Sequence, residues 1–306
     1  MADALVIGTR GSELALFQAH WVAKRMRDAA PGMSIEIEII ETRGDQVRDV
    51  PLAQVGGKGI FTKELENALL DGRIDLAVHS LKDMPTVFPD GLMLGAIPWR
   101  ANPFDALVCS IATSLADLPS GARVGTSSLR RGAQIRAYRP DLEILNLRGN
   151  VDTRVRRVRE GALDAAILAC AGLERLERHT DIAQVIPASI MIPAPGQGAL
   201  AIELREDDGD TRTLVQRIND PRCAAEVTAE RRCLALLEGG CQAPIGAHAV
   251  ASGDRLTMEA CVCSPDGQTC LRVRHEGDFS DPLALGDQVA DSLFAQGAGA
   301  IIAAAR

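Results

Sequence analysis

Residues 192–206 read IPAPGQGALAIELRE, a proline- and glycine-rich segment that runs directly into an apolar strand pattern. Two prolines and two glycines within residues 192–198 are typical of a hinge and not of a helix or strand interior. The strand pattern that follows has no obvious place among the strands and helices just before it. A chain that crosses into a second lobe and later returns to the first would explain this order. The segment therefore predicts two lobes joined by two crossings.

The first half of the chain shows strand patterns that alternate with helical ones. The runs ALVIG (4–8), IEIEII (35–40) and IDLAVHS (74–80) are apolar or alternate in polarity, which is typical of strands. Helical patterns separate them, and this rhythm favours a mainly parallel sheet covered by helices. A second series begins near residue 104, after PWRANP (98–103), whose prolines predict the first crossing.

The last third of the chain predicts a small domain of mixed helix and strand. Asp220 followed by Pro221 combines a capping residue with a proline at the first helical position. Three strand patterns follow, and the short turns at 252–254 and 265–267 between them suit antiparallel hairpins.

The predicted fold class is α/β, with two hinged lobes of the periplasmic-binding-protein type and a C-terminal α+β domain that carries a three-stranded antiparallel sheet. The predicted boundaries are 1–98 with 199–219 for lobe one, 104–192 for lobe two, 220–306 for the C-terminal domain, and 99–103 and 193–198 for the hinges.

Charge and composition narrow the classes of ligand. The 306 residues carry a net charge of −8, yet arginines are concentrated between Arg123 and Arg159. Because the planar guanidinium group matches carboxylates and phosphates, this pattern favours a small polyanion as ligand. An aromatic content of 3% offers little base stacking, and the net sign opposes binding of nucleic acid. No apolar run approaches the length of a membrane span, so we expect neither nucleic acid nor a membrane as partner.

The eight cysteines follow no even framework, which fits a reducing cytoplasm. Cys261, Cys263 and Cys270 are interpreted as packing residues, and because no histidine pair completes a zinc set, no metal is expected. The N-terminus shows no secretory pattern, so a cytoplasmic location is expected. Cys241 differs, because the glycines of EGGCQAPIG (238–246) keep the approach to its thiol open. This loop favours a reactive or modified sulfur.

Two turns share one local pattern. VIGTRGS (6–12) and VGTSS (124–128) each run from a strand through glycine and threonine into a helix. Backbone N–H groups and the helix dipole make such junctions favourable for anions. The hydroxyls that add donors are those of Ser12, Thr126, Ser127 and Ser128. With one turn in each lobe, and Arg130 and Arg131 after the second, the pattern predicts a cleft for carboxylates or phosphates.

HSLKDMP (79–85) follows the third predicted strand, at the edge where α/β proteins place their chemistry. An extended backbone here would direct Lys82 and Asp83 to opposite sides, one toward the charge of a ligand and one toward its reacting centre. With cations beside it, Asp83 is expected to stay ionised and to suit a cationic intermediate. His79 is expected to be a hydrogen-bonded structural residue.

These motifs together resemble those of the porphobilinogen deaminase, or hydroxymethylbilane synthase, family over the whole chain. The motifs are VIGTRGSELALFQA, ETRGD, VGGKGIFTKELE, DLAVHSLKDMP, VGTSSLRR, LRGNVDTR, LACAGLERL, PAPGQGALAIE and EGGCQAPIGA. The resemblance implies a transferase that polymerises four porphobilinogen molecules, with loss of ammonia, onto a covalently bound dipyrromethane cofactor. It releases linear hydroxymethylbilane by hydrolysis, a step in haem and tetrapyrrole biosynthesis. The resemblance also implies a monomer without an obligate protein partner.

The same resemblance implies roles for individual residues. It makes Asp83 the catalytic carboxylate and Cys241 the covalent attachment site of dipyrromethane. The implied cofactor contacts are Ser80, Lys82, Thr126, Ser127, Ser128, Arg130, Arg131, Arg148 and Gly149. The implied substrate contacts are Arg10, Ser12, Gln18, Arg148, Arg154, Arg175 and Gln197. Lys58 and Phe61 match a lid-like segment, and Gln54 stands where many relatives have lysine, which leaves its role open.

Two other functional classes stay open on the residues alone. A two-lobed protein that binds small anions without catalysis would explain the crossings and arginines, but neither Cys241 nor Asp83. A hydrolase with a thiol nucleophile would explain Cys241 but needs a base. No histidine occupies a comparable loop, and His248 falls on a strand pattern.

Overall fold

The structure is a computed structural model that describes residues 4–42, 44, 61–237 and 243–305. The predictions for Gln54, Lys58 and Cys241 therefore lie outside the described residues. The chain divides into two compact units, Met1–Arg100 with Ala199–Ala224 and Ala101–Gly198 with Ala225–Arg306. The finer division into three domains with two hinges stays a prediction.

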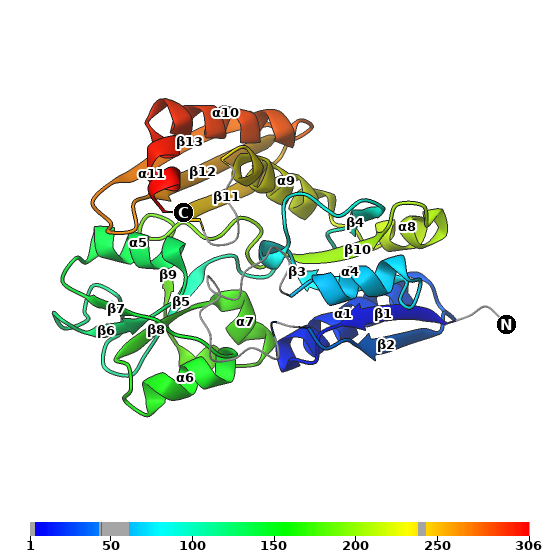
Figure 1. Cartoon of the computed structure of the whole chain (residues 1–306), viewed down its shortest axis with the longest axis horizontal. Helices are drawn as coiled ribbons and strands as arrows, with labels where there is room; N and C mark the ends of the chain where they lie inside the picture. The colour runs from blue at the N-terminus through cyan, green and yellow to red at the C-terminus, as the bar shows by residue number, and fades with distance from the viewer. Residues whose placement is uncertain (1–3, 43, 45–60, 238–242, 306) are drawn as a thin grey trace. The chain divides into compact units, whose positions relative to one another are not determined.

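The first unit is built on a sheet whose strands come from both of its sequence segments (Figure 1). In chain order its elements are β1 (Leu5–Thr9), α1 (Glu13–Ala29), β2 (Ile35–Ile39), α4 (Lys63–Leu70), β3 (Leu76–Ser80), the 3₁₀ turn η1 (Leu81–Asp83), β4 (Leu92–Ala96), β10 (Leu200–Arg205) and α8 (Gly209–Gln216). The described strands follow the order β2-β1-β3-β10-β4. β1 runs parallel to β2 and β3, whereas β10 is antiparallel to both of its neighbours. The predicted return of the chain to the first lobe is thus confirmed, and the edge strand β4 was not predicted.

Burial on both faces fixes the orientation of β3. Leu76 and Val78 pack in the cluster formed with α1 and α8, whereas Ala77 packs with α4 on the other face. Since successive strand residues point to opposite faces, Ser80 belongs to the α1 face and His79 to the α4 face. The apolar pattern of this strand therefore determines where its polar end residues point.

The second unit contains a sheet of matching topology. Its elements are β5 (Asp105–Cys109), β6 (Arg123–Gly125), α5 (Leu129–Tyr138), β7 (Glu143–Leu145), α6 (Val151–Arg159), β8 (Ala165–Ala169), α7 (Cys170–Arg175), η2 (His179–Asp181) and β9 (Ile182–Ile186). Its described strands follow the order β7-β6-β8-β5-β9, with β5 antiparallel to β8 and β9. In each sheet the reversed strand is the one that follows a crossing segment. The edge strand β9, like β4, was not predicted.

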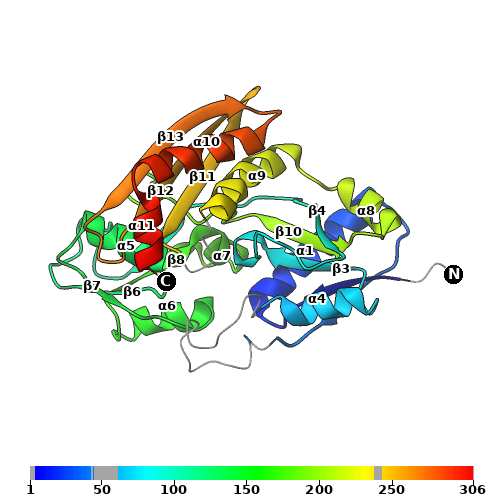
Figure 2. The ribbon, with the colours of Figure 1, turned by 45° about the horizontal axis from the view of Figure 1, so that its top comes forward.

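The C-terminal part of the chain forms an antiparallel sheet with helices on one face (Figure 2). Its elements are α9 (Pro221–Leu236), β11 (Ile245–Ser252), β12 (Arg255–Cys263), β13 (Cys270–Asp278), α10 (Pro282–Ala295) and α11 (Ala298–Ala304). The three described strands pair as consecutive hairpins, as the turns predicted. Within the described chain, no helix combines the length and the apolar character needed to span a bilayer.

The cysteines of this sheet are partly as predicted. Cys261 and Cys263 are buried in an apolar cluster with Ala133 and Ile192, and Cys270 packs against it, which confirms their packing role. In addition, Cys263 and Cys270 face each other across β12 and β13 and are joined by a disulfide. The interpretation as packing residues alone was wrong for this pair, because the pairing depends on hairpin register and not on spacing.

The second crossing segment is fixed by close backbone contacts in the second unit. Gly198 has a φ of +86°, and a Cβ there would lie 2.5 Å from the carbonyl oxygen of Ala101. The N–H of Gly196 donates to a carboxylate oxygen of Glu230 at 2.7 Å, and Glu230 is fully buried. Glycine is therefore required at position 198 both by backbone conformation and by space.

We expect Gly198→Ala to lower the free energy of unfolding by about 1–3 kcal/mol, because alanine meets both a strained φ and the Ala101 carbonyl. Gly209→Ala is the matched control, since no atom lies near its Cβ position and its φ is not in the left-handed region. Thermal or urea unfolding of the two variants measures the difference. An unfolding midpoint equal to that of wild type in Gly198→Ala would contradict this account of the crossing.

Candidate functional site

The end of β3 gathers several predicted residues of the first unit. Gln18 is buried on α1, and its Nε2 donates to Ser80 Oγ at 2.9 Å. Beyond Ser80 the chain does not stay extended as predicted, because Lys82 and Asp83 lie in the 3₁₀ turn η1. Three residues per turn still separate adjacent side chains by about 120°. Asp83 is exposed at this strand end, and Lys82 is half-buried.

The turn between β1 and α1, which the sequence predicts to favour anions, also carries predicted site residues. Ser12 precedes α1, and its Oγ accepts a hydrogen bond from Ala15 N at 3.3 Å. A hydroxyl that accepts from the backbone keeps its own O–H available to donate to a ligand. The guanidinium of Arg10 lies over the ring of Phe61, 4.3 Å from its centroid. The predicted substrate arginine and the predicted lid residue are thus in cation–π contact.

A buried polar cluster lies on the α4 face of β3. Nε2 of His79 is 3.0 Å from Oε2 of Glu203, and both side chains are almost fully buried. Glu66 of α4 is buried beside them, and its pKa is raised by burial and by the negative charge of Glu203. His79 is thus buried beside a carboxylate, but among the described residues its Nε2 has no hydrogen-bond partner, so the predicted hydrogen bond is not found at this atom. Glu203 was missed because its place beside His79 depends on the insertion of β10 next to β3.

The turn between β6 and α5 repeats the arrangement of the turn between β1 and α1, with a serine hydroxyl at the start of the helix. Ser128 precedes α5, and its Oγ accepts from Arg131 N at 3.4 Å, while Thr126 Oγ1 accepts from Ser128 N at 3.2 Å. The Ser128 hydroxyl therefore also keeps a proton that it can donate. Ser127 is used differently, because its hydroxyl donates to the carbonyl oxygen of Leu147 at 2.6 Å. It ties the turn to the loop that follows β7.

The two adjacent arginines of this turn share one buried carboxylate. Arg130 Nη1 lies 2.7 Å from Asp105 Oδ2, and Arg131 Nη2 lies 2.7 Å from Asp105 Oδ1. Gln197 Nε2 donates to the same Oδ1 at 3.0 Å. Burial opposes ionisation of Asp105, but the charges and hydrogen bonds of these neighbours outweigh it and hold its pKa well below its usual value. Asp105 was missed because FDALVCS reads as an apolar strand, and nothing local shows which side chains its one acid faces.

The start of α6 holds three further predicted residues. Gly149 has a φ of +111°, and a Cβ there would lie 2.7 Å from Cγ2 of Thr153. Arg154 Nε donates to the carbonyl oxygen of Gly149 at 2.8 Å. Nη1 of Arg148 is buried and has no hydrogen-bond partner among the residues that the structure describes. A buried cationic donor in this state favours a ligand that supplies an acceptor.

Arg175 ends α7 and is buried, with Nη2 donating to the carbonyl oxygen of Gly198 at 2.6 Å. Burial lowers its pKa to about 10, so the group is still a cation at neutral pH. Of the predicted residues that the structure describes, the second unit holds Thr126, Ser127, Ser128, Arg130, Arg131, Arg148, Gly149, Arg154, Arg175 and Gln197, and the first holds Arg10, Ser12, Gln18, Phe61, Ser80, Lys82 and Asp83. Their roles toward a ligand stay predictions.

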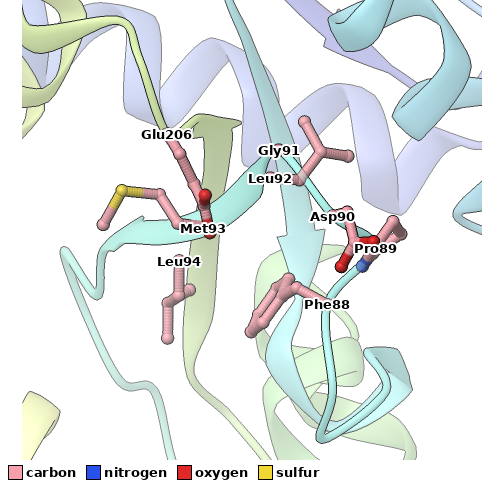
Figure 3. A pocket seen from close by; sticks show the side chains of 8 residues that line it. All are labelled: Phe88, Pro89, Asp90, Gly91, Leu92, Met93, Leu94 and Glu206. Carbon is pink, nitrogen blue, oxygen red and sulfur yellow. The ribbon is translucent and has the colours of Figure 1, made fainter.

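A cavity of about 600 Å³ lies elsewhere in the first unit, along β4 (Figure 3). Its described lining is formed by residues 88–94 and Glu206, and none of the predicted site residues is among them. Asp90 and Glu206 supply the charged groups of this lining, which includes neither lysine nor arginine. This cavity is therefore unsuited to a ligand rich in carboxylates.

Comparison with known proteins identifies relatives along the whole chain. The family described as "Porphobilinogen deaminase, dipyromethane cofactor binding domain" matches residues 5–213, and "Porphobilinogen deaminase, C-terminal domain" matches residues 224–295. A porphobilinogen deaminase of Brevibacillus brevis is 51% identical over 298 residues, which cover 97% of this chain and 96% of the relative. One from Pelotomaculum thermopropionicum is 48% identical and covers 100% and 98% of the two chains.

The solved structures that align with this chain are less similar to it in sequence. The methionine binding protein MetQ aligns with a TM-score of 0.46 at 14% identity, over 70% of this chain and 89% of that one. A periplasmic substrate-binding protein of an ABC transporter from Coxiella burnetii aligns with a TM-score of 0.45 at 16% identity, over 74% and 96%. With identities near 50% over nearly its full length, this chain belongs to the porphobilinogen deaminase family.

Proposed function

We propose that Asp83 is the catalytic carboxylate of this enzyme and that Cys241 carries its dipyrromethane cofactor. The enzyme joins four porphobilinogen molecules with loss of ammonia and releases hydroxymethylbilane, the reaction of its family. The observation that carries the assignment of Asp83 is its exposed carboxylate on η1, directly after the strand end where Gln18 bonds Ser80.

Asp83 suits the charge that develops in this reaction. Loss of ammonia from the aminomethyl group of porphobilinogen leaves a cationic azafulvene, and a fixed carboxylate lowers the energy of that charge. The neighbouring Lys82 is directed differently by the 3₁₀ turn, so it is placed to bind a carboxylate while Asp83 faces the reacting centre. The anionic carboxylate and the cationic centre of the substrate then contact different sides of the turn.

The second unit offers donors that fit a cofactor with several carboxylates. Nη1 of Arg148 is a buried donor lacking a described partner, and Gly149 leaves the backbone beside it without a Cβ. Ser128 retains an O–H donor next to Arg130 and Arg131. When bound, dipyrromethane supplies the pyrrole carbon to which the first substrate ring is joined. We assign cofactor binding to Ser80, Lys82, Thr126, Ser127, Ser128, Arg130, Arg131, Arg148 and Gly149.

The state of five of the seven other cysteines supports attachment at Cys241. Burial raises the pKa of Cys170 and Cys233 to about 12 and that of Cys261 to about 11, so few thiolates form there at neutral pH. Cys263 and Cys270 are joined to each other. Covalent chemistry at sulfur requires the thiolate, so these five positions are poor alternatives.

Substrate binding is assigned to Arg10, Ser12, Gln18, Arg148, Arg154, Arg175 and Gln197. The hydroxyl of Ser12 and the guanidinium groups in this set match the carboxylates of porphobilinogen. We further propose that the enzyme works in the cytoplasm as a monomer, without nucleic acid, a membrane or an obligate protein partner. The lid role of Lys58 and Phe61 stays a prediction.

Cys241→Ser should be purified without the covalent adduct, since an alcohol is a far weaker nucleophile at neutral pH than a thiol. Intact mass under denaturing conditions should show two porphobilinogen units, each without its ammonia, on wild type and on the control Cys109→Ser. Turnover of Cys241→Ser should be nearly abolished while its circular dichroism stays unchanged. An adduct of normal mass on another cysteine of the variant would refute the assignment.

Asp83→Ala should lower the turnover rate by roughly 10²–10³-fold or more, as expected for loss of one preorganised electrostatic group. Asp83→Glu keeps the charge but moves it, and should retain a small part of the rate. Asp90→Ala removes another exposed acid of the same unit and should be active. Near-normal turnover in Asp83→Ala would remove this residue from the catalytic role.

Arg148→Ala should weaken binding of carboxylates by roughly 10- to 100-fold, the effect of one charge-assisted hydrogen bond. Intact mass should then show apo-protein, or species that stop at an incomplete number of substrate rings. Arg156→Ala removes an exposed arginine of α6 that pairs with Glu160 and serves as control. A wild-type distribution of species in Arg148→Ala would contradict its role.

A further inference from the structure

The buried carboxylate of Asp105 is the common acceptor of three predicted ligand-binding side chains. Arg131 contacts Oδ1 through Nε at 2.9 Å and Nη2 at 2.7 Å, while Arg130 contacts Oδ2 at 2.7 Å and Oδ1 at 3.3 Å. Gln197 adds its hydrogen bond to Oδ1 at 3.0 Å. Because both arginines use two nitrogens, each planar guanidinium is held in one orientation and not only at one distance.

Backbone carbonyls fix the same guanidinium groups from other directions. Arg130 Nη1 also donates to the carbonyl oxygen of Ile192 at 2.8 Å, and Arg131 Nη1 donates to that of Ile167 at 3.1 Å. Arg130 and Arg131 are 4% and 6% exposed. Their side chains are thus set in place by the protein before any ligand arrives.

This cluster is a poor source of folding stability. Burying ionic groups carries a desolvation penalty that their attraction often fails to exceed, and apolar replacements of such clusters are frequently as stable. Here one carboxylate serves two guanidinium groups, so the three side chains carry one net positive charge in the interior. That surplus favours a further anion, which a ligand carboxylate supplies.

The cluster is also connected to both crossing segments. Besides its bond to Asp105, Gln197 Nε2 donates to the carbonyl oxygen of Pro103 at 2.8 Å. Gly196, next to Gln197, is held by the buried Glu230. Asp105 itself begins β5 directly after the first crossing. The orientation of the arginines is therefore fixed relative to residues 103 and 196–198 of the second unit.

We propose that Asp105 is a positioning residue that orients Arg130 and Arg131 for the carboxylates of the cofactor. The inference rests on the proposed function, in which these arginines bind dipyrromethane. Asp105 acts through the arginines, and Gln197 supports it through their shared hydrogen bond. Its removal should weaken loading of the cofactor without altering the bond-forming chemistry at Cys241.

The test is stepwise loading of apo-protein with porphobilinogen, followed by intact mass. Asp105→Asn keeps the shape and an acceptor oxygen but loses the charge. The half-saturating concentration for adduct formation should rise by roughly tenfold or more, the effect of losing the hydrogen bonds that orient two charged groups. The final extent of loading should stay close to wild type, whereas the thermal midpoint of the apo-protein should fall, because the variant leaves two buried guanidinium groups without their carboxylate. A residue with only a structural role would change the thermal midpoint and leave the concentration dependence unchanged.

Asp164→Asn is the matched control. Asp164 binds Arg123 through two nitrogens in the same unit, at 2.9 and 3.1 Å, and contacts none of the predicted ligand-binding side chains in the described structure. Its loading curve should equal that of wild type. If Asp105→Asn fails to fold, Asp105→Glu is used, which keeps the charge but displaces it by one methylene, and its half-saturating concentration should still rise.

A wild-type half-saturating concentration in whichever Asp105 variant folds would overturn the inference. Failure of the wild-type apo-protein to take up any adduct would instead count against the proposed function. An equal rise of the half-saturating concentration in Asp164→Asn would also overturn the inference. The effect would then follow from the loss of any aspartate that pairs with an arginine in this unit.

Discussion

The fold depends on one strand insertion. β10 lies between β3 and β4 and is antiparallel to both, so residues 76–96 complete their hydrogen bonding only when residues 200–205 are in place. Unpaired strand edges are unfavourable and prone to wrong pairing, which makes this insertion a requirement for an ordered β3. Since η1 continues directly from β3, the position of Asp83 depends on a segment more than 100 residues later in the chain.

The second sheet is also completed by an inserted antiparallel strand, which here follows the first crossing segment and not the second. β5, which follows the first crossing, lies between β8 and β9 and is antiparallel to both. Each reversed strand also brings a buried acid to its sheet, Asp105 on β5 and Glu203 on β10. In both sheets, therefore, the strand that completes the hydrogen bonding also supplies a carboxylate to a buried polar cluster.

The sequence predicted what local patterns determine. The strands β1, β2 and β3 follow from the polarity pattern of the sequence, and so do the turns that lead into α1 and α5. The caps that Ser12 and Ser128 form there were not predicted. The edge strands β4 and β9 were not predicted, because short edge strands show little regular alternation of polar and apolar residues. Other features were not predicted because each depends on strand register or on a partner far away in sequence; these are the contacts of Asp105 and Glu203 and the Cys263–Cys270 disulfide. For Cys241 and Asp83 the local patterns predicted only a reactive or modified sulfur and an ionised carboxylate, and the roles in cofactor attachment and catalysis are predictions that rest on the family motifs.

Asp105 and Asp83 differ in their surroundings, and the difference bears on why the proposed catalytic carboxylate lies on a different element from the buried arginines. Asp105 lies among arginines, and its oxygens accept hydrogen bonds from Arg130, Arg131 and Gln197. A carboxylate engaged in this way cannot approach a developing cation, because its charge and lone pairs are already used. Asp83 is exposed on η1 in the first unit, whereas the buried arginine pair belongs to the second. In the mechanism that we propose, a substrate that carries carboxylates and also passes through a cationic state needs both kinds of group. Their position on different elements would then preserve the charge of each for its own part of the ligand.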